Sequence, residues 1–215
     1  MSGDNNLVIK PNLTDRTSRS AGQNDEVIAI RLNGFGIIHP LRDKQKIRQI
    51  FPSEQLGPVM RFDPATSRRN IQMGYYDTMR FMRELPGQLY YFSEKADGFA
   101  AFAALPENAI KAAGIPLRLP EGLSPRRALF EHILPAVAAE LRLPREAGYD
   151  DLLLALLEHR VEQLGIGRFR WYTPAQLQAV IAESTALPEE PRRPLLRSRP
   201  LEAAEILAAA LPLLG

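Results

Sequence analysis

The stretch DDLLLALLEHRVEQLGIGRFRWYTPAQLQAVI, residues 150–181, contains the clearest structural signals in the chain. Asp150 is a helix-capping residue type, and the leucine-rich segment after it predicts a helix over residues 151–164 that Gly165 ends. Thr173-Pro174-Ala175-Gln176 then combines an N-cap, a proline at the first helical position and a capping-box glutamine. The stretch therefore predicts two helices joined by a short connection.

That connection carries Arg168-Phe169-Arg170-Trp171-Tyr172, which includes the only tryptophan of the chain. In an extended conformation alternate side chains point to opposite faces, so Phe169 and Trp171 lie on one face. Arg168, Arg170 and Tyr172 lie on the other face. Arginines interleaved with aromatic rings supply phosphate contacts and base stacking together, as single-stranded nucleic acids require. Two interpretations stay open: a nucleic-acid surface, or a connector whose Phe169 and Trp171 are buried.

Helical patterns continue on both sides of this stretch. Residues 108–113 predict a short helix, and Ser124-Pro125 predicts the start of a longer one that runs towards Leu141. Pro135 lies inside the longer helix and is expected to kink or break it. The C-terminal half is therefore mainly helical.

The N-terminal half shows strand signals as well. Residues 27–32 and 35–38 flank Asn33-Gly34, a pattern typical of a β-hairpin. Residues 88–92 and 99–104 flank a polar run and predict a second hairpin. The expected fold class is therefore α+β, with a small antiparallel sheet built from two hairpins in the N-terminal half.

Two helices are expected between the hairpins. One begins at Pro40 and continues to Ile50. The other covers residues 69–85, because apolar residues recur there at spacings of three and four. These residues are predicted to form the buried stripe of the helix: Ile71, Tyr75, Met79, Met82 and Leu85.

The patterns divide the chain into five parts: a flexible tail over residues 1–25, an α+β part over 26–105, a helical part over 106–184, a Pro/Arg linker over 185–200, and a docking helix over 201–215. The linker prolines Pro188, Pro191 and Pro194 recur every third residue, which favours polyproline II.

The apolar C-terminal helix follows this proline-rich linker directly. Such an arrangement can deliver a docking element to another protein subunit or to a second copy of the chain. The alternative is that the helix folds back onto its own domain. The partner-binding residues expected on it are apolar: Leu201, Ile206, Leu207 and Leu211.

Composition limits the classes of function. The chain is 45% hydrophobic and 24% charged, which is ordinary for a globular protein, and its net charge of +2 excludes a binder that acts through charge alone. The chain lacks cysteine, so disulfides, thiolate metal sites and thiol nucleophiles are excluded. The N-terminus is polar and no segment reaches about 20 apolar residues, so we expect a cytoplasmic protein without a membrane partner.

Arginine dominates the basic residues, with 22 arginines and 5 lysines. This bias suits phosphate recognition, although a GC-rich bacterial genome also produces it. Arg68 and Arg69 form a second basic cluster, so we predict RNA or DNA contact by these two residues together with the run at 168–172. A solvated helix surface is the alternative.

No catalytic constellation is evident. The three histidines, His39, His132 and His159, lie in separate segments without metal-ligand spacing, and no cofactor motif is present, so neither a metal nor a cofactor is expected. Arg127 and His132 are five residues apart, which resembles the R-x4-6-H motif of HEPN-type ribonucleases. The resemblance covers six residues and implies metal-independent RNA cleavage by Arg127 and His132 at a helical dimer interface. On an α-helix the two side chains are about 140° apart, so a second subunit would have to bring them together.

The sequence thus favours a non-enzymatic subunit or adaptor of a bacterial multi-protein assembly. Contact with nucleic acid through an arginine and aromatic surface is an added expectation. The HEPN-like ribonuclease is the alternative.

Overall fold

The structure, a computed structural model, describes residues 6–9, 27–31, 47–58, 63–120, 122–185 and 198–212. The chain divides into two compact units, Met1–Glu84 and Leu85–Gly215. Helices and strands are both present, in keeping with a mixed fold class. The expected boundary between the α+β part and the helical part, at residues 105–106, falls inside the second unit.

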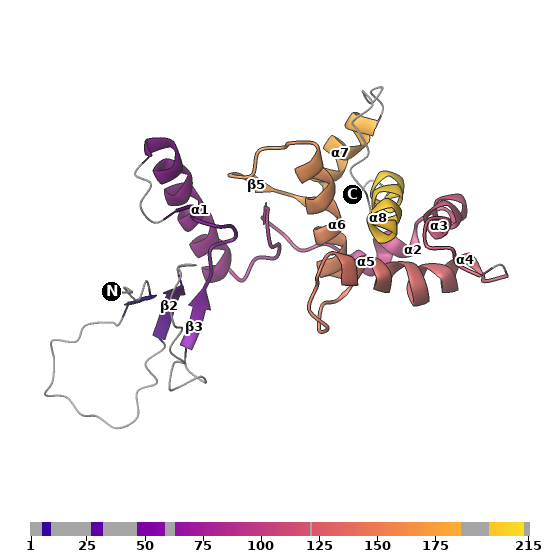
Figure 1. Ribbon diagram of the computed structural model, residues 1–215, viewed down its shortest axis with the longest axis horizontal. Helices are drawn as coiled ribbons and strands as arrows, with labels where there is room; N and C mark the ends of the chain where they lie inside the picture. The colour runs from indigo at the N-terminus through magenta and orange to yellow at the C-terminus, as the bar shows by residue number, and fades with distance from the viewer. Residues whose placement is uncertain are drawn as a thin grey trace, which may run out of the picture. The chain divides into compact units, whose positions relative to one another are not determined.

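The first unit contains a three-stranded sheet in the order β1-β2-β3, formed by Asn6–Ile9, Val27–Arg31 and Ile47–Ile50. The central strand β2 is antiparallel to β1 and parallel to β3 (Figure 1). The return arm of the predicted first hairpin, residues 35–38, lies outside the described residues. The predicted helix from Pro40 to Ile50 is wrong at its end, because Ile47–Ile50 pairs with β2 through contacts distant in the sequence.

Helix α1, Pro64–Met82, accompanies this sheet. It begins five residues before the predicted start, because Asp63 caps it by accepting hydrogen bonds from the backbone N–H groups of Ala65 and Thr66 at 3.2 and 3.1 Å. Its buried residues are Met73 and Asp77. The predicted apolar stripe does not enter this core: Ile71, Tyr75 and Met82 are exposed.

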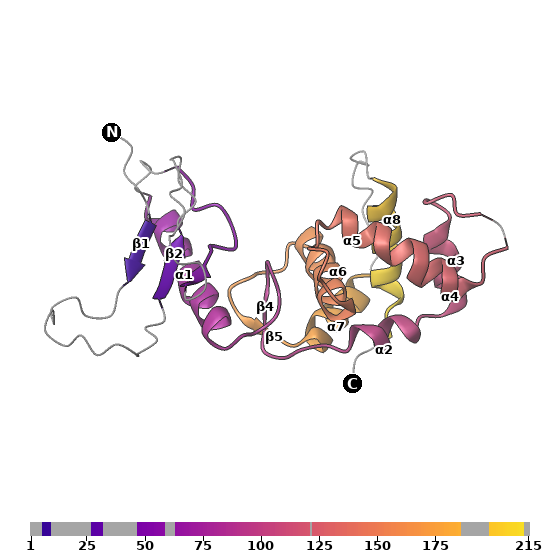
Figure 2. The same ribbon diagram turned by 90° about the horizontal axis from the view of Figure 1, so that it is seen from below.

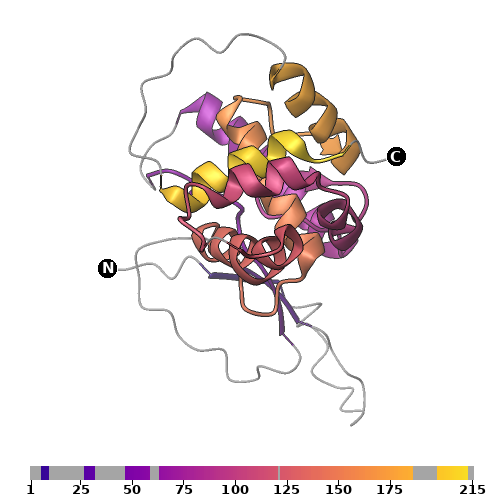
Figure 3. The same cartoon turned by 90° about the vertical axis from the view of Figure 1, so that its right-hand side faces the viewer.

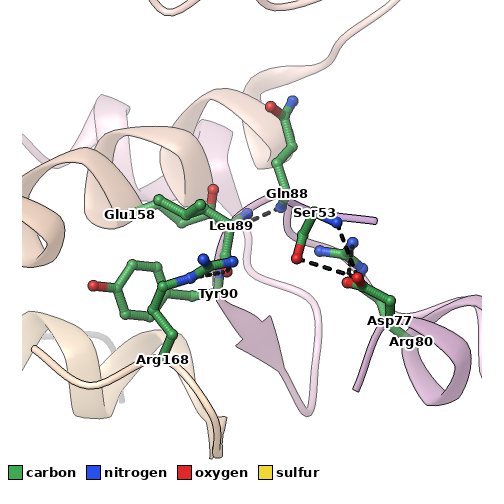
Figure 4. Close-up of polar contacts among 8 residues, drawn as sticks. All are labelled: Ser53, Asp77, Arg80, Gln88, Leu89, Tyr90, Glu158 and Arg168. Carbon is green, nitrogen blue, oxygen red and sulfur yellow. Dashed lines mark hydrogen bonds and ion pairs between the residues drawn. The ribbon is translucent and has the colours of Figure 1, made fainter. Parts of the chain in front are cut away.

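The polar residue on the buried face of α1 is Asp77, and its carboxylate has both hydrogen-bond and ion-pair partners. Asp77 accepts hydrogen bonds from the backbone N–H and the hydroxyl of Ser53, at 2.9 and 3.2 Å. Arg80 pairs with the same carboxylate at 3.1 Å (Figure 4). Because a buried carboxylate without partners is strongly unfavourable, these contacts explain how α1 accommodates a charge in its core.

The second unit holds a two-stranded parallel sheet of β4, Tyr91–Phe92, and β5, Trp171–Tyr172 (Figure 2). The predicted second hairpin is wrong. Its return arm, residues 99–104, belongs largely to helix α2, Gly98–Ala103. Alanine is abundant there, and the Asp97 side chain accepts from the Ala100 N–H at 2.8 Å, so local propensity and capping both favour a helix.

Helices form the rest of the second unit. They are α3 (Glu107–Gly114), α4 (Pro125–Arg127), the π-helical segment η1 (Ala128–Ile133), α5 (Leu134–Glu140), α6 (Tyr149–Gln163), α7 (Pro174–Thr185) and α8 (Arg199–Ala210). The main hydrophobic core lies wholly in this unit, and α6 contributes five of its leucines: Leu152, Leu153, Leu154, Leu156 and Leu157.

The predicted helix starts are confirmed in the second unit, with one shift. Ser124 caps α4 by accepting from the Arg127 N–H at 3.4 Å. Thr173 and Gln176 form the predicted capping box, with reciprocal hydrogen bonds of 3.0 and 3.1 Å. Helix α6 begins two residues before the predicted start, with Gly148 as its N-cap, and the side chain of Asp151 accepts a hydrogen bond from the Gly148 N–H.

Pro135 does not break the helix that begins at Ser124. The chain passes from α4 into η1 and then into α5 without a gap. The N–H of Leu134 bonds to the carbonyl of Leu129, five residues earlier. A proline cannot donate to the preceding turn, and the wider π-helical turn just before it accommodates this loss.

Helix α8 folds back onto the second unit and packs against α3, α5, α6 and α7 (Figure 3). Ala203, Ala204, Leu207 and Ala208 are buried in the core. The predicted linker residues 186–197, with their three prolines, lie outside the described residues.

Candidate functional site

The arginine and aromatic run at 168–172 serves largely as an internal connector. The Arg168 guanidinium donates from Nε and Nη2 to the backbone carbonyl of Leu89, at 2.8 and 2.6 Å (Figure 4). Tyr172 is buried, whereas Trp171 is half-buried and makes an edge contact with Tyr91 at 6.0 Å between ring centroids. The connector interpretation placed Phe169 and Trp171 in the core, but both are only half-buried, and it is Tyr172 that is buried.

A buried carboxylate secures the other side of the same loop. Oε1 of Glu158 accepts hydrogen bonds from the backbone N–H groups of Gln88, Leu89 and Tyr90, at 2.9, 3.1 and 3.0 Å. Gly87 precedes them with φ of +100°, and a Cβ there would lie 2.7 Å from both Phe92 Cδ2 and the Tyr90 carbonyl. The loop therefore requires glycine, and its N–H groups form an anion-binding arrangement that Glu158 itself occupies.

Two tyrosine hydroxyls complete this connector. Tyr90 donates to the carbonyl of Ile166 at 2.8 Å, and Tyr172 donates to the carbonyl of Gly167. Burial raises the pKa of Tyr90 well above its usual value, and the charges of Glu162, Tyr172 and Glu158 act in the same direction. The hydroxyl therefore stays protonated and serves as a structural donor.

The predicted nucleic-acid residues are separated between the two units. Arg170 is exposed, and its guanidinium lies over the Tyr172 ring at 4.4 Å from the centroid. Arg69, in the first unit, forms an ion pair with Glu54, while Arg68 beside it is exposed. Arg168 and Arg69 are thus each engaged within their own unit, whereas Arg68 and Arg170 are exposed.

Arg127 and His132, the ribonuclease pair, are both exposed. Arg127 forms an ion pair with Glu131, with Nη2 at 3.0 Å from Oε2 and Nε also donating at 3.0 Å. Hydrogen bonding to Arg127 holds the pKa of Glu131 below its usual range, with smaller help from the charge of His132. The same ion pair raises the pKa of Arg127.

The predicted docking residues of α8 differ in exposure. Leu207 and Leu211 are buried in the chain's own core, so the structure does not leave them free for a partner. Leu201 and Ile206 are half-buried. The helix folds back because its alanines allow close approach to α3, and this burial removes its apolar face from solvent.

The structure brings together three aromatic residues that sequence patterns did not single out: Phe99, Phe130 and Tyr149. Their ring centroids are 5.5–5.8 Å apart. Phe99 is 57% exposed and Tyr149 39% exposed, while Phe130 is half-buried. We call these three residues the aromatic surface.

Three elements of the second unit position the aromatic surface. Phe99 lies on α2, Phe130 on η1, and Tyr149 is the first residue of α6. Gly98 allows α2 to touch the start of α6, since a Cβ at Gly98 would lie 2.0 Å from the carbonyl oxygen of Tyr149. The Gly98 N–H also donates to Asp150 at 2.8 Å.

No local periodicity links these three rings, because they come from separate elements. The exposed ion pair of Arg127 and Glu131 lies within three residues of Phe130, on the continuous helix formed by α4 and η1. An exposed aromatic centre with a polar rim is the composition of many protein-binding surfaces.

The described residues hold no group of three or more His, Asp or Glu side chains suited to a metal ion. Within the same part of the chain, no helix combines the length and apolar character that a membrane span requires. Comparison of the chain with models of known families, with curated proteins and with solved structures found no match.

Proposed function

We propose that this chain is a non-enzymatic subunit or adaptor that binds a protein partner through the aromatic surface. The observation that carries this proposal is the exposure of Phe99 and Tyr149 around the half-buried ring of Phe130. Clustered aromatic side chains supply most of the binding free energy in many protein interfaces.

The aromatic surface is preorganised for such a role. Phe102 is fully buried and makes an edge contact with Tyr149 at 6.4 Å between centroids. The three rings of the aromatic surface are thus held on helices above a buried side chain, so binding would freeze few additional torsions. A rigid aromatic cluster fits a partner segment that offers aliphatic or proline side chains.

A protein partner is better supported than nucleic acid. Arg168 binds a backbone carbonyl and Arg69 pairs with Glu54. Near the aromatic surface, Glu131 offsets the charge of Arg127 and adds a carboxylate that repels phosphate. Protein contact therefore takes the place of the nucleic-acid contact expected from the sequence.

Photocrosslinking tests the proposal directly. The chain carries p-benzoylphenylalanine in place of Phe99 in its native cells, and the matched control carries it in place of Ile115, which is 76% exposed elsewhere in the second unit. We expect a discrete protein adduct from position 99 alone, which Phe130→Ala abolishes. Nuclease-sensitive adducts, or identical adducts from both positions, would contradict the proposal.

The ribonuclease remains a second candidate because of one observation. Residues 128–133 form a π-helix, in which hydrogen bonds join residues five apart, so Arg127 and His132 lie closer around this helix than in an α-helix. Cleavage of a fluorescent RNA in the presence of EDTA, lost in His132→Ala and kept in Arg126→Ala, would support this activity. A wild-type chain that leaves the RNA intact rules it out.

A further inference from the structure

One glutamine side chain links helices α6 and α8 of the second unit. Nε2 of Gln163 donates to Oε1 of Glu205 on α8 at 2.9 Å, and it lies 3.1 Å from Nε2 of His159, one turn earlier on α6. Oε1 of Gln163 accepts from Nη1 of Arg160 at 3.2 Å. His159, Gln163 and Glu205 are half-buried and Arg160 is buried. We call these four residues the α6–α8 network.

The two charged neighbours fix the orientation of the Gln163 amide. A guanidinium only donates hydrogen bonds and an ionised carboxylate only accepts them, so Oε1 has to face Arg160 and Nε2 has to face Glu205. The second N–H of Nε2 is then the group that faces His159, and the His159 ring nitrogen has to accept it. An imidazole nitrogen accepts only when it carries no proton, so this network requires a neutral His159 with its proton on Nδ1.

Protonation of His159 is incompatible with this set of hydrogen bonds. An imidazolium carries an N–H on both ring nitrogens, so two donors would face each other across the 3.1 Å contact with Gln163. Rotating the amide by half a turn does not relieve the conflict, because its NH2 group would then face Arg160 and its oxygen would face Glu205. Each orientation of the amide therefore costs the network at least one hydrogen bond.

The two charged members of the network act on a protonated imidazole in opposite directions. Glu205 on α8 attracts it, and Arg160 on α6, which is only 8% exposed, repels it. Among the helices packed against α6, α2 has no ionisable side chain. The other charged side chains of α7 and α8 are exposed: Glu183, Arg199 and Glu202. Because the two charges oppose each other, the hydrogen bond from Gln163 decides which form of the imidazole the folded chain favours.

We propose that His159 is a pH-sensitive latch: its neutral imidazole completes the network that holds α8 on α6, and its protonation loosens α8. The folded chain then takes up this proton at lower pH than the unfolded chain, in which histidines titrate at about pH 6.5. The contribution of the latch is therefore fully present above about pH 6.5 and is lost as the pH falls below it. Loosening of α8 uncovers its buried face: Ala203, Ala204, Leu207 and Ala208.

Hydrogen exchange of the full chain tests the latch, because the protection of the α8 amides measures how often this helix opens. Protection factors, corrected for the intrinsic effect of pH, are compared at about pH 7.5 and about pH 5.5. We expect the wild-type α8 to lose about tenfold in protection at the lower pH, the effect of about one hydrogen bond. His159→Gln offers Gln163 an acceptor that does not titrate, so its α8 should lose little. His132→Gln, at the exposed histidine of η1, is the matched control and should behave like wild type.

Nitrogen NMR of the imidazole rings tests the same proposal on the wild-type chain, and the two glutamine variants assign the signals. We expect His159 to carry its proton on Nδ1 at neutral pH and to titrate at lower pH than the exposed His132. Three outcomes would overturn the proposal: a His159 proton on Nε2 at neutral pH, a His159 titration midpoint at or above that of His132, or an equal loss of α8 protection in wild type and His159→Gln.

Discussion

At the scale of single residues, Glu158 and Arg168 hold the loop after Gly87 from two sides. Glu158 accepts three backbone N–H groups, and Arg168 donates twice to the carbonyl of Leu89. Charged residues are rarely buried in proteins unless their hydrogen bonds are satisfied. These two residues therefore fix the backbone of residues 88–90 within the second unit.

Two substitutions at Glu158, to alanine and to glutamine, separate the loss of its acceptor oxygen from the loss of its charge. Glu158→Ala should lower the free energy of unfolding by about 3 kcal/mol, because three N–H groups lose their acceptor. Glu158→Gln keeps an oxygen and should cost about 1 kcal/mol. Urea denaturation measures both values, with Glu162→Ala, exposed on the same helix, as a control expected within about 0.5 kcal/mol of wild type. Equal effects of Ala and Gln would contradict this role.

The Tyr90 hydroxyl makes the free energy of unfolding depend on pH in the alkaline range. Its folded-state pKa is raised above the unfolded value of about 10, so the unfolded chain releases this proton first and stability falls as pH rises above about 10. Tyr90→Phe removes this contribution together with the hydrogen bond to Ile166. Unfolding midpoints from pH 7 to pH 11 should therefore show the advantage of wild type over Tyr90→Phe shrinking above about pH 10.

The control for Tyr90→Phe is the same substitution at the exposed Tyr75. Because the Tyr75 side chain is exposed, this substitution should change the unfolding midpoint little. If the difference in unfolding midpoint between wild type and Tyr90→Phe stayed constant from pH 7 to pH 11, the Tyr90 hydroxyl would not contribute to the pH dependence of stability, and the prediction would be contradicted.

At the scale of elements, close packing of α2 on the start of α6 positions the aromatic surface. The contact depends on Gly98, where a Cβ would lie 2.0 Å from the Tyr149 carbonyl oxygen and 2.6 Å from the Asp150 N. Both neighbours are backbone atoms, so neither can rotate away as a side chain does.

Gly98→Ala should therefore destabilise the second unit by about 1–3 kcal/mol, as overpacking does, and weaken partner binding by displacing Phe99. Gly74→Ala on α1 is the matched control. A Cβ there meets nothing within 4 Å, so it should stabilise the helix by about 0.5–1 kcal/mol. Thermal and urea unfolding measure both variants, and a neutral Gly98→Ala would contradict the packing.

The sequence predicted elements with strong local signals and missed those that depend on distant pairing. The N-cap at Ser124 and the capping box at Thr173 each lie within four residues, and both appear as predicted. Strand β4 instead pairs with β5, about 80 residues away in the sequence numbering, which no local pattern reveals. The apolar stripe of α1 was predicted to be buried, but Ile71, Tyr75 and Met82 are exposed, because periodicity identifies an apolar face without showing what covers it.

The same contrast between local signals and distant contacts applies to the candidate site. The exposed pair Arg127 and His132 and the run at 168–172 were visible as motifs, yet the structure uses Arg168 as an internal donor. The aromatic surface was not predicted, since its three rings come from three elements and meet only in the folded chain.

At the scale of the whole molecule, the two units differ in how they are held together. The main hydrophobic core belongs to Leu85–Gly215, and α8 closes it with four buried residues and Leu211 beyond its end. The C-terminal helix is thus part of the domain that presents the aromatic surface.

Removal of residues 198–215 should abolish cooperative unfolding of the second unit, because α8 covers core side chains on α3, α5 and α6. Leu207→Ala, at a side chain with no exposed surface, should lower the free energy of unfolding by about 3 kcal/mol. Differential scanning calorimetry measures both, with Glu202→Ala on the exposed face of α8 as control. A truncated chain with an unchanged transition would show that α8 is dispensable for folding.

The central claim is that the aromatic surface binds a protein partner, and calorimetric affinity measurement tests it most directly. The partner identified by crosslinking at position 99 is titrated into wild type, Phe99→Ala and Ile115→Ala, both substitutions at exposed side chains. We predict that Phe99→Ala weakens binding at least tenfold, which corresponds to about 1.4 kcal/mol, while Ile115→Ala leaves it unchanged. Equal affinities of wild type and Phe99→Ala would contradict the claim.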